Sequence, residues 1–217
     1  MAARAVIFDL DGTLLDTLED ICQAVNAALR GHGAPPRPKD HYRLLVGDGV
    51  PHLVRNTFPA ELLREPGEER LIESVRTEYA RRADAASAPY PGVAELLDAL
   101  AAHETPTAIL SNKPEPFALR AVELALGRWR FRRVRGARPD APLKPDPRAA
   151  LEIAADLGVP PEEIVFLGDT AVDMKTARAA GMRAAGALWG FRGREELEAS
   201  GAQDLLERPT DLVPLLD

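Results

Sequence analysis

Two carboxylates separated by one residue follow a short apolar run near the start of the chain. Asp9 and Asp11 come directly after the run AVIF at residues 5–8, a pattern typical of a buried strand. Ionised groups at the mouth of such a strand lose hydration and repel each other, so they need a cation, a proton or a substrate that compensates this cost. The pair therefore indicates a chemical site rather than ordinary surface.

Further polar groups stand after apolar runs or at helix starts later in the chain. They are Ser111-Asn112-Lys113, Lys144-Pro145, and Asp169 with Asp173. In an open α/β sheet, the carboxyl ends of the strands and the helix N-termini beyond them form the ligand crevice. We therefore expect these segments to converge with Asp9 and Asp11.

The residue types in this set favour phosphoryl chemistry with a hard cation. Clustered carboxylates without a nearby His or Cys favour Mg²⁺ over Zn²⁺, and Mg²⁺ usually leaves one carboxylate free. An aspartate can attack phosphorus to form an aspartyl-phosphate, while a second carboxyl protonates the leaving oxygen and later deprotonates water. Asp9 and Asp11 suit these two roles. Lys144, Ser111 and backbone amides can supply the positive charge and donors that the transferred oxygens need.

Alternating helices and strands from residue 92 onward predict the scaffold. Helices are predicted over 92–102, 116–126, 147–157, 170–180 and 195–200, and strands over 107–110, 164–167 and 184–188. This order predicts an α/β fold with a doubly wound parallel sheet. Arginines alternate with Trp129 and Phe131 over residues 128–135, which favours an edge strand with inward-facing rings over a polyanion site.

The pattern changes between residues 16 and 88, where no strand is expected. Helices are predicted there over 18–29, 42–46, 50–56 and 68–82. We therefore expect a helical domain over residues 16–88, inserted into a Rossmann-like sheet domain over residues 1–15 and 89–217. The segment APYPG at 88–92 is expected to return the chain to the sheet.

Composition limits the partners of the protein. The 217 residues carry a net charge of −7, which argues against broad nucleic-acid binding and against binding to anionic membranes. The sequence shows no long apolar segment and no cleavage-site pattern at its start, so a cytoplasmic location is expected. Oligomeric state is left open.

Four motifs in order carry a family resemblance. They are DLDGTLLDT at 9–17, SNK at 111–113, KP at 144–145 and GDTAVD at 168–173. Each is weak alone, but the ordered set resembles the four motifs of the haloacid dehalogenase superfamily. The helical insertion after the first motif and the segment WGF at 189–191 resemble phosphoglycolate phosphatases, and this resemblance covers nearly the whole chain.

The resemblance implies roles for the four acidic residues. Asp9 would be the nucleophile and a Mg²⁺ ligand. Asp11 would be the general acid and base, and would offer its backbone carbonyl to the metal. Asp169 would be a further metal ligand, and Asp173 would support the site from behind these ligands. Mg²⁺ is the implied cofactor.

The resemblance also implies roles for the other motif residues. Ser111 and Asn112 would hold the phosphoryl group, and Lys144 would neutralise it and orient Asp9. Thr13, also assigned to the substrate site, would steady the first loop. Lys113 matches the family less diagnostically and is treated as an accessory residue.

The inserted helices would form a cap that closes over the site, excludes water and chooses the leaving group. Hinges are expected near Thr17 and Pro89. The cap loop Gly47-Asp48-Gly49 is a candidate for substrate contact through Gly47 and Gly49, since glycine permits close backbone approach. A simple turn between helices is the alternative interpretation.

The expected function is hydrolysis of a small phosphorylated metabolite, with 2-phosphoglycolate as the expected substrate, by a Mg²⁺-dependent phosphatase that forms an aspartyl-phosphate at Asp9. A phosphosugar mutase of the same superfamily and a non-catalytic protein that binds phosphorylated ligands are the alternatives. A dehalogenase is disfavoured, because halide displacement has no evident use for a Mg²⁺ cluster or for an acid/base carboxyl at Asp11.

Overall fold

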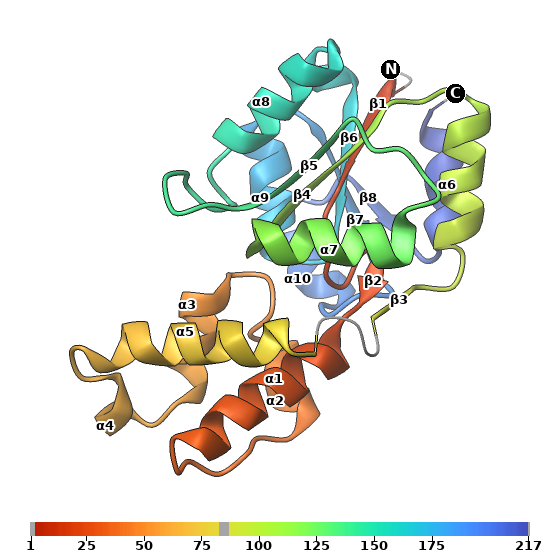
Figure 1. The fold of residues 1–217 in the computed structure, drawn as a ribbon. Coiled ribbons are helices and arrows are strands. Elements are labelled where there is room, and N and C mark those ends of the chain that lie inside the picture. Colours follow the sequence, from red (N-terminus) through yellow and green to blue (C-terminus); the bar gives the residue numbers. More distant parts are fainter. Residues whose placement is uncertain (1–2, 83–86, 217) are drawn as a thin grey trace.

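A six-stranded parallel sheet forms the centre of the protein (Figure 1). The computed structural model describes residues 3–82 and 87–216, so residues 1–2, 83–86 and 217 of the predicted domains lie outside the described residues. The strand order is β5-β4-β1-β6-β7-β8, with every neighbouring pair parallel. The strands are β1 (Ala5–Phe8), β4 (Thr107–Pro114), β5 (Arg133–Ala137), β6 (Ile164–Gly168), β7 (Arg183–Ala187) and β8 (Asp204–Leu206). The predicted α/β class with a parallel sheet is confirmed.

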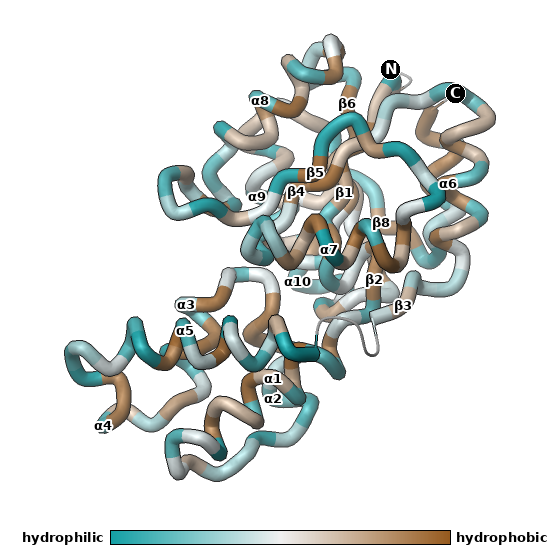
Figure 2. Tube along the Cα trace, in the orientation of Figure 1, coloured by the Kyte–Doolittle hydropathy of each residue, from teal (hydrophilic) through white to brown (hydrophobic). Residues whose placement is uncertain are grey.

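Helices cover both faces of this sheet, because alternate residues of a strand point to opposite sides. Val6 and Phe8 of β1 pack in one cluster, and Ala5 and Ile7 pack in the other. The first face is covered by α6 (Val93–Ala102), α7 (Glu115–Leu126) and the 3₁₀ helix η2 (Pro209–Leu215), and the second by α8 (Arg148–Leu157), α9 (Ala171–Ala179) and α10 (Arg194–Ala199). The short 3₁₀ helix η1 (Pro161–Glu163) precedes β6. Figure 2 shows hydrophobic stretches along the central strands and at intervals along the helices.

A separate helical lobe lies beyond the carboxyl ends of the strands (Figure 1). It contains α1 (Leu18–Gly31), α2 (Lys39–Arg43), α3 (Val50–Thr57), α4 (Ala60–Leu63) and α5 (Gly67–Ala80). These helices share a hydrophobic core of their own, in which Val25, Tyr42, Val54 and Leu71 are buried. Phe191, from the sheet part of the chain, also belongs to this core. The helical lobe therefore has its own packing and one aromatic anchor on the sheet side.

The chain passes between the sheet and the helical lobe twice, and the two connecting segments pair as short antiparallel strands. In this pair β2 (Leu15–Asp16) contacts β3 (Ala88–Pro89), with Leu15 opposite Pro89. The expectation that residues 16–88 contain no strand was therefore wrong at both of its ends. Strands of two residues are too short to produce an alternating pattern in sequence.

Other boundaries also differ from the predicted ones. The predicted helix over 42–46 lies instead at α2 (Lys39–Arg43), which starts after Pro38 and ends before the chain turns at Gly47. Strand β5 begins only at Arg133, so the edge strand predicted from residue 128 starts five residues late. Trp129 and Phe131 still pack against the core, as expected, but they do so from the loop before the strand.

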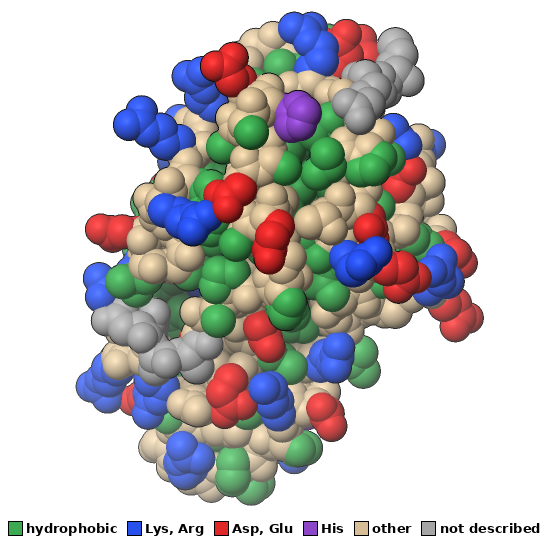
Figure 3. Space-filling model, turned by 90° about the vertical axis from the view of Figure 1, so that its right-hand side faces the viewer, with side chains coloured by type: hydrophobic (Ala, Val, Ile, Leu, Met, Phe, Trp, Pro, Cys, Tyr) green, Lys and Arg blue, Asp and Glu red, His purple; other side chains and the backbone are tan. Residues whose placement is uncertain are grey.

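Charge is distributed rather than segregated on the surface drawn in Figure 3. Acidic and basic side chains of the described residues are intermixed on this face. Within residues 3–82 and 87–216, no helix is long and apolar enough to cross a membrane.

Candidate active site

The first acidic pair lies where β1 ends. Asp9 follows this strand directly, and both Asp9 and Asp11 are buried. The chain turns sharply at Gly12, whose φ of +89° favours glycine. A Cβ atom at Gly12 would lie 2.4 Å from Asp169 Oδ2, so the absence of a side chain lets this loop approach Asp169. Local backbone geometry thus joins the first and last motifs.

Lys144 brings two of the aspartates together. Its Nζ atom lies 2.8 Å from Asp9 Oδ1 and 2.7 Å from Asp173 Oδ1, and its side chain is 2% exposed. One carboxylate oxygen from each of Asp9, Asp169 and Asp173 lies within 4.8 Å of the others. Three segments that are far apart in sequence therefore meet at the carboxyl ends of β1 and β6.

This cluster carries more negative charge than Lys144 can neutralise. Burial raises the pKa of the Asp9 carboxyl to about 7, although Lys144 opposes this shift. Burial and the carboxylates of Asp173 and Asp9 raise the pKa of Asp169 well above its usual range. Burial alone would lower the pKa of Lys144, but Asp173 and Asp9 outweigh it, so this pKa is raised and the ammonium stays charged. The unmatched charge fits a divalent cation with oxygen ligands.

Asp169 is held by residues from both ends of the chain. Thr13 Oγ1 donates a hydrogen bond to Asp169 Oδ1 at 2.8 Å, and the Phe191 backbone N–H donates to Oδ2 at 2.8 Å. Trp189 Nε1 donates to the Thr13 carbonyl at 2.9 Å, so the loop that carries Trp189 and Phe191 is bonded to the loop that carries Thr13. Thr13 was predicted in the substrate site, and the structure places it against Asp169.

Asp173 anchors the start of α9. Its Oδ2 atom accepts hydrogen bonds from the Thr170 N–H at 3.0 Å and the Thr170 hydroxyl at 2.6 Å, in a capping box. Its Oδ1 atom faces Lys144. Because both oxygens are engaged, Asp173 is better suited to positioning Lys144 than to direct metal ligation.

Asn112, near the end of β4, connects this strand to two loops. Its Nδ2 donates to the carbonyls of Gly47 at 2.9 Å and Lys144 at 3.0 Å, and its Oδ1 accepts from the Lys144 N–H at 2.9 Å. The Ser111 hydroxyl accepts a hydrogen bond from the Lys113 backbone N–H at 3.2 Å. The amide of Asn112 therefore positions Lys144 and the cap loop, and both Ser111 and Asn112 line the pocket described below.

Lys113 has a clear partner that the sequence did not reveal. Its Nζ atom lies 2.8 Å from Asp11 Oδ1, and 4.5 Å from the ring centre of Tyr79 on α5. Burial alone would lower the pKa of Lys113, but Asp11 and Tyr79 outweigh it, so this pKa is raised. Its place in the motif SNK at 111–113 was the only sequence signal. Lys113 therefore holds the Asp11 side chain in place through this ion pair.

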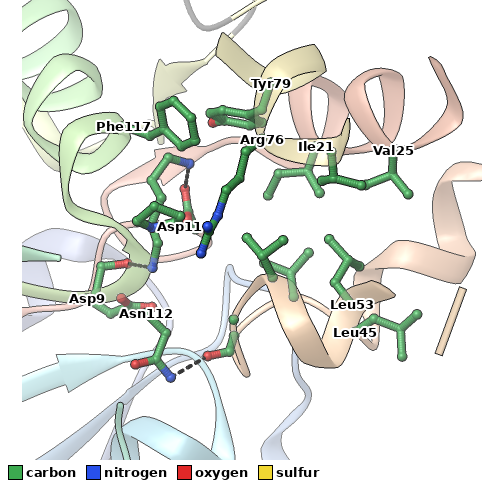
Figure 4. Close-up of a pocket in the computed structure, with 18 residues that line it drawn as sticks. Asp9, Asp11, Ile21, Val25, Leu45, Leu53, Arg76, Tyr79, Asn112 and Phe117 are labelled. Carbon is green, nitrogen blue, oxygen red and sulfur yellow. Dashed lines mark hydrogen bonds and ion pairs between the residues drawn. The ribbon is translucent and has the colours of Figure 1, made fainter. Parts of the chain in front are cut away.

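An open pocket separates the sheet from the helical lobe (Figure 4). It spans about 640 Å³ when the open solvent at its mouth is included. Its floor contains Asp9, Asp11 and Ser111, and Gly47 and Gly49 line the cap side. These two glycines have positive φ angles of +119° and +85°. The loop predicted as a substrate contact thus both turns the chain and faces the pocket.

Two arginines connect the cap, just before the cap loop, to the sheet domain, and neither contact was predicted from the sequence. Arg192 donates to the carbonyls of Arg43, Leu44 and Val46. Arg43 in turn donates to the carbonyls of Gly190 and Phe191, beside the amide that holds Asp169. In a chain rich in arginine, residue type alone gave no signal for either contact.

Comparisons with known proteins agree with this geometry. The family model of haloacid dehalogenase-like hydrolases matches residues 3–181. The chain is 33% identical over 218 residues to phosphoglycolate phosphatase 1 of Pseudomonas aeruginosa, covering 99% of this chain and 80% of the relative. It is 36% identical to phosphoglycolate phosphatase of Xylella fastidiosa (strain 9a5c), covering 95% and 90%. It is also 33% identical to N-acetylmuramic acid 6-phosphate phosphatase of P. aeruginosa, covering 100% and 96%.

Solved structures share the fold over the full chain. A protein from Lactobacillus delbrueckii subsp. bulgaricus has a TM-score of 0.90 and 27% identity, with 100% of this chain and 99% of that chain covered. The CbbY protein of Rhodobacter sphaeroides in complex with xylulose-(1,5)bisphosphate has a TM-score of 0.82 and 23% identity, with 99% of each chain covered. This second similarity concerns the fold alone.

Proposed function

The chain belongs to the haloacid dehalogenase-like hydrolases and is a phosphatase resembling phosphoglycolate phosphatases, and we propose that it hydrolyses 2-phosphoglycolate through an aspartyl-phosphate on Asp9. The observation that carries this proposal is the position of Asp9, which is buried beside Lys144 and forms part of the pocket floor. In this proposal, residues 1–15 and 89–217 form the catalytic core and residues 16–88 form the cap.

The reaction would proceed in two displacements at phosphorus. A carboxylate oxygen of Asp9 forms a bond to phosphorus as the ester oxygen leaves, and Asp11 donates a proton to that oxygen. Asp11 then takes a proton from water, whose oxygen attacks the aspartyl-phosphate and releases inorganic phosphate and free Asp9. Lys144 keeps its charge at Asp9, and Lys113 holds Asp11 in place.

Mg²⁺ is the proposed cofactor of this site. Its ligands would be the carboxylates of Asp9 and Asp169 and the backbone carbonyl of Asp11, with Asp173 holding Lys144 beside them. When bound, Mg²⁺ supplies positive charge to the phosphoryl oxygens. Ser111 and backbone amides at the end of β4 would receive the remaining phosphoryl oxygens.

Phosphate release tests the proposed function directly. Purified protein with Mg²⁺ is expected to release inorganic phosphate from 2-phosphoglycolate and to lose this activity with a chelator. A phosphosugar mutase would instead convert a sugar phosphate to its isomer without net phosphate release, and a binding protein would release phosphate from no ester in a panel. Either result would contradict hydrolysis.

Mg²⁺ should stabilise the fold, and more strongly as pH rises. The pKa values of Asp9 and Asp169 are higher in the native state than in the unfolded state, so both carboxyls hold protons in the metal-free native protein. The stability of the metal-free protein therefore falls as pH rises from about 4 to about 7. Bound Mg²⁺ requires these carboxylates ionised. At a concentration about 100 times its dissociation constant, Mg²⁺ should add about 2.7 kcal/mol and raise Tm by about 5–10 °C.

Thermal unfolding at about pH 5 and about pH 8 measures this effect. The increase in Tm should be small at the lower pH, should reach its full size at the higher pH, and should disappear in Asp169→Asn. Asp140→Asn, a change at an exposed aspartate, serves as the matched control and should respond to Mg²⁺ like the unmodified protein. An equal increase at both pH values would contradict the proposed ligand set.

A further inference from the structure

One basic side chain of the cap points into the pocket and has only a loose partner. Arg76 extends from α5 into the pocket, past Tyr79 and toward Asp11 (Figure 4). Its side chain is 44% exposed, and it forms an ion pair at 3.9 Å with Glu73, whose side chain is 71% exposed. An exposed pair at this distance holds the guanidinium only weakly.

The lysines of the site are bound much more tightly. Lys113 lies 2.8 Å from Asp11, and Lys144 lies within 2.8 Å of both Asp9 and Asp173. Both lysines are thus committed to carboxylates of the protein. Among the described residues that line the pocket, Arg76 is the basic one that remains available for an anionic group of a ligand.

Apart from the Tyr79 ring and the backbone of Gly47 and Gly49, the rest of the cap wall is apolar. Ile21, Val25, Leu53 and Val75 line it together with Arg76. Sugar hydroxyl groups packed against these aliphatic side chains would lack hydrogen-bond partners, at a cost for each. A short carbon chain that ends in a single anionic group would avoid this cost. The wall therefore favours a compact leaving group with its charge at the far end.

We propose that Arg76 determines specificity by binding a carboxylate of the leaving group, so that the preferred substrates are phosphate esters of short hydroxycarboxylic acids. This inference rests on the proposed function, because it takes Asp9 as the position of the phosphoryl group. The planar guanidinium of arginine can donate two parallel hydrogen bonds to the two carboxylate oxygens. Recognition at Arg76 adds no step to the reaction, and it orients the ester for attack by Asp9.

Two phosphonates separate recognition from turnover. In 3-phosphonopropionate, a methylene group replaces the bridging oxygen of 2-phosphoglycolate, and propylphosphonate has a methyl group in place of the carboxylate. Calorimetry with Mg²⁺ should show that the unmodified protein binds the first at least about tenfold more tightly than the second. This preference should fall to about twofold or less in Arg76→Gln, and Arg76→Lys should keep part of it. Arg70→Gln, on the exposed face of α5, should keep all of it.

Two results would overturn the inference: no carboxylate preference in the unmodified protein, or an unchanged preference in Arg76→Gln. Hydrolysis of 2-phosphoglycolate by the same preparation is measured in parallel. A preference that depends on Arg76, without hydrolysis, would refute the proposed function and support the carboxylate site. Hydrolysis without such a preference would support the proposed function and refute the carboxylate site.

Discussion

Replacing Asp9 with asparagine should reduce kcat/KM for 2-phosphoglycolate by about 10⁴-fold or more. The amide of asparagine is a poor nucleophile and cannot form the aspartyl-phosphate. The change is almost isosteric, and it removes a buried carboxylate whose pKa is raised to about 7, so the variant is expected to fold. Phosphate release with saturating Mg²⁺ measures the loss.

Asp11→Asn provides the contrasting variant, because it leaves Asp9 able to react. With p-nitrophenyl phosphate, whose leaving group needs no proton, the first displacement should proceed and the second should slow. Acid quenching should therefore trap phosphate on Asp11→Asn and none on Asp9→Asn. The surface change Asp140→Asn should match the unmodified protein. Phosphate trapped on Asp9→Asn, or activity within about tenfold of normal, would remove Asp9 as the nucleophile.

Periodic patterns predicted the long elements of this fold and failed on the short ones. The alternation of helices and strands after residue 92 correctly predicted the parallel sheet, because each of these helices buries an apolar face and each strand carries a buried run. The strand pair β2 and β3 and the four-residue helix α4 are too short for either period to be detected. Pairing between residues 15 and 89 is a tertiary feature that no local pattern contains.

Chemistry-bearing residues were predicted more fully than their partners. The positions of Asp9, Asp169 and Lys144 after strands indicated that they would meet, and the structure brings them together. Which lysine would face which aspartate depends on loop geometry, so the contact between Lys113 and Asp11 went unpredicted. The surroundings of Arg76 and Arg192 depend on where the cap lies over the sheet. Packing between the two lobes sets that position, so a single sequence does not predict it.

Replacing Lys144 with methionine should destabilise the protein by about 3–5 kcal/mol at about pH 8, because two buried carboxylates lose their shared cation. The loss of stability should depend on pH, because the carboxyl groups that face Lys144 titrate. Removing Lys144 raises the native pKa of Asp9 further above its unfolded value, so the penalty is absent below about pH 4 and grows as pH rises. Urea unfolding at about pH 5 and about pH 8 should show the larger loss at the higher value.

Activity separates this electrostatic role from simple loss of packing. Asp9 must be ionised to attack phosphorus, and without Lys144 its pKa should rise. The acidic limb of the pH profile of kcat/KM should therefore move to higher pH, and kcat/KM itself should fall by about 10²-fold or more. Lys175→Met, an exposed lysine on α9, is the matched control and should change neither stability nor the profile. A Lys144→Met enzyme with reduced kcat/KM but an unshifted acidic limb would mean that Lys144 supports the fold without setting the charge of Asp9.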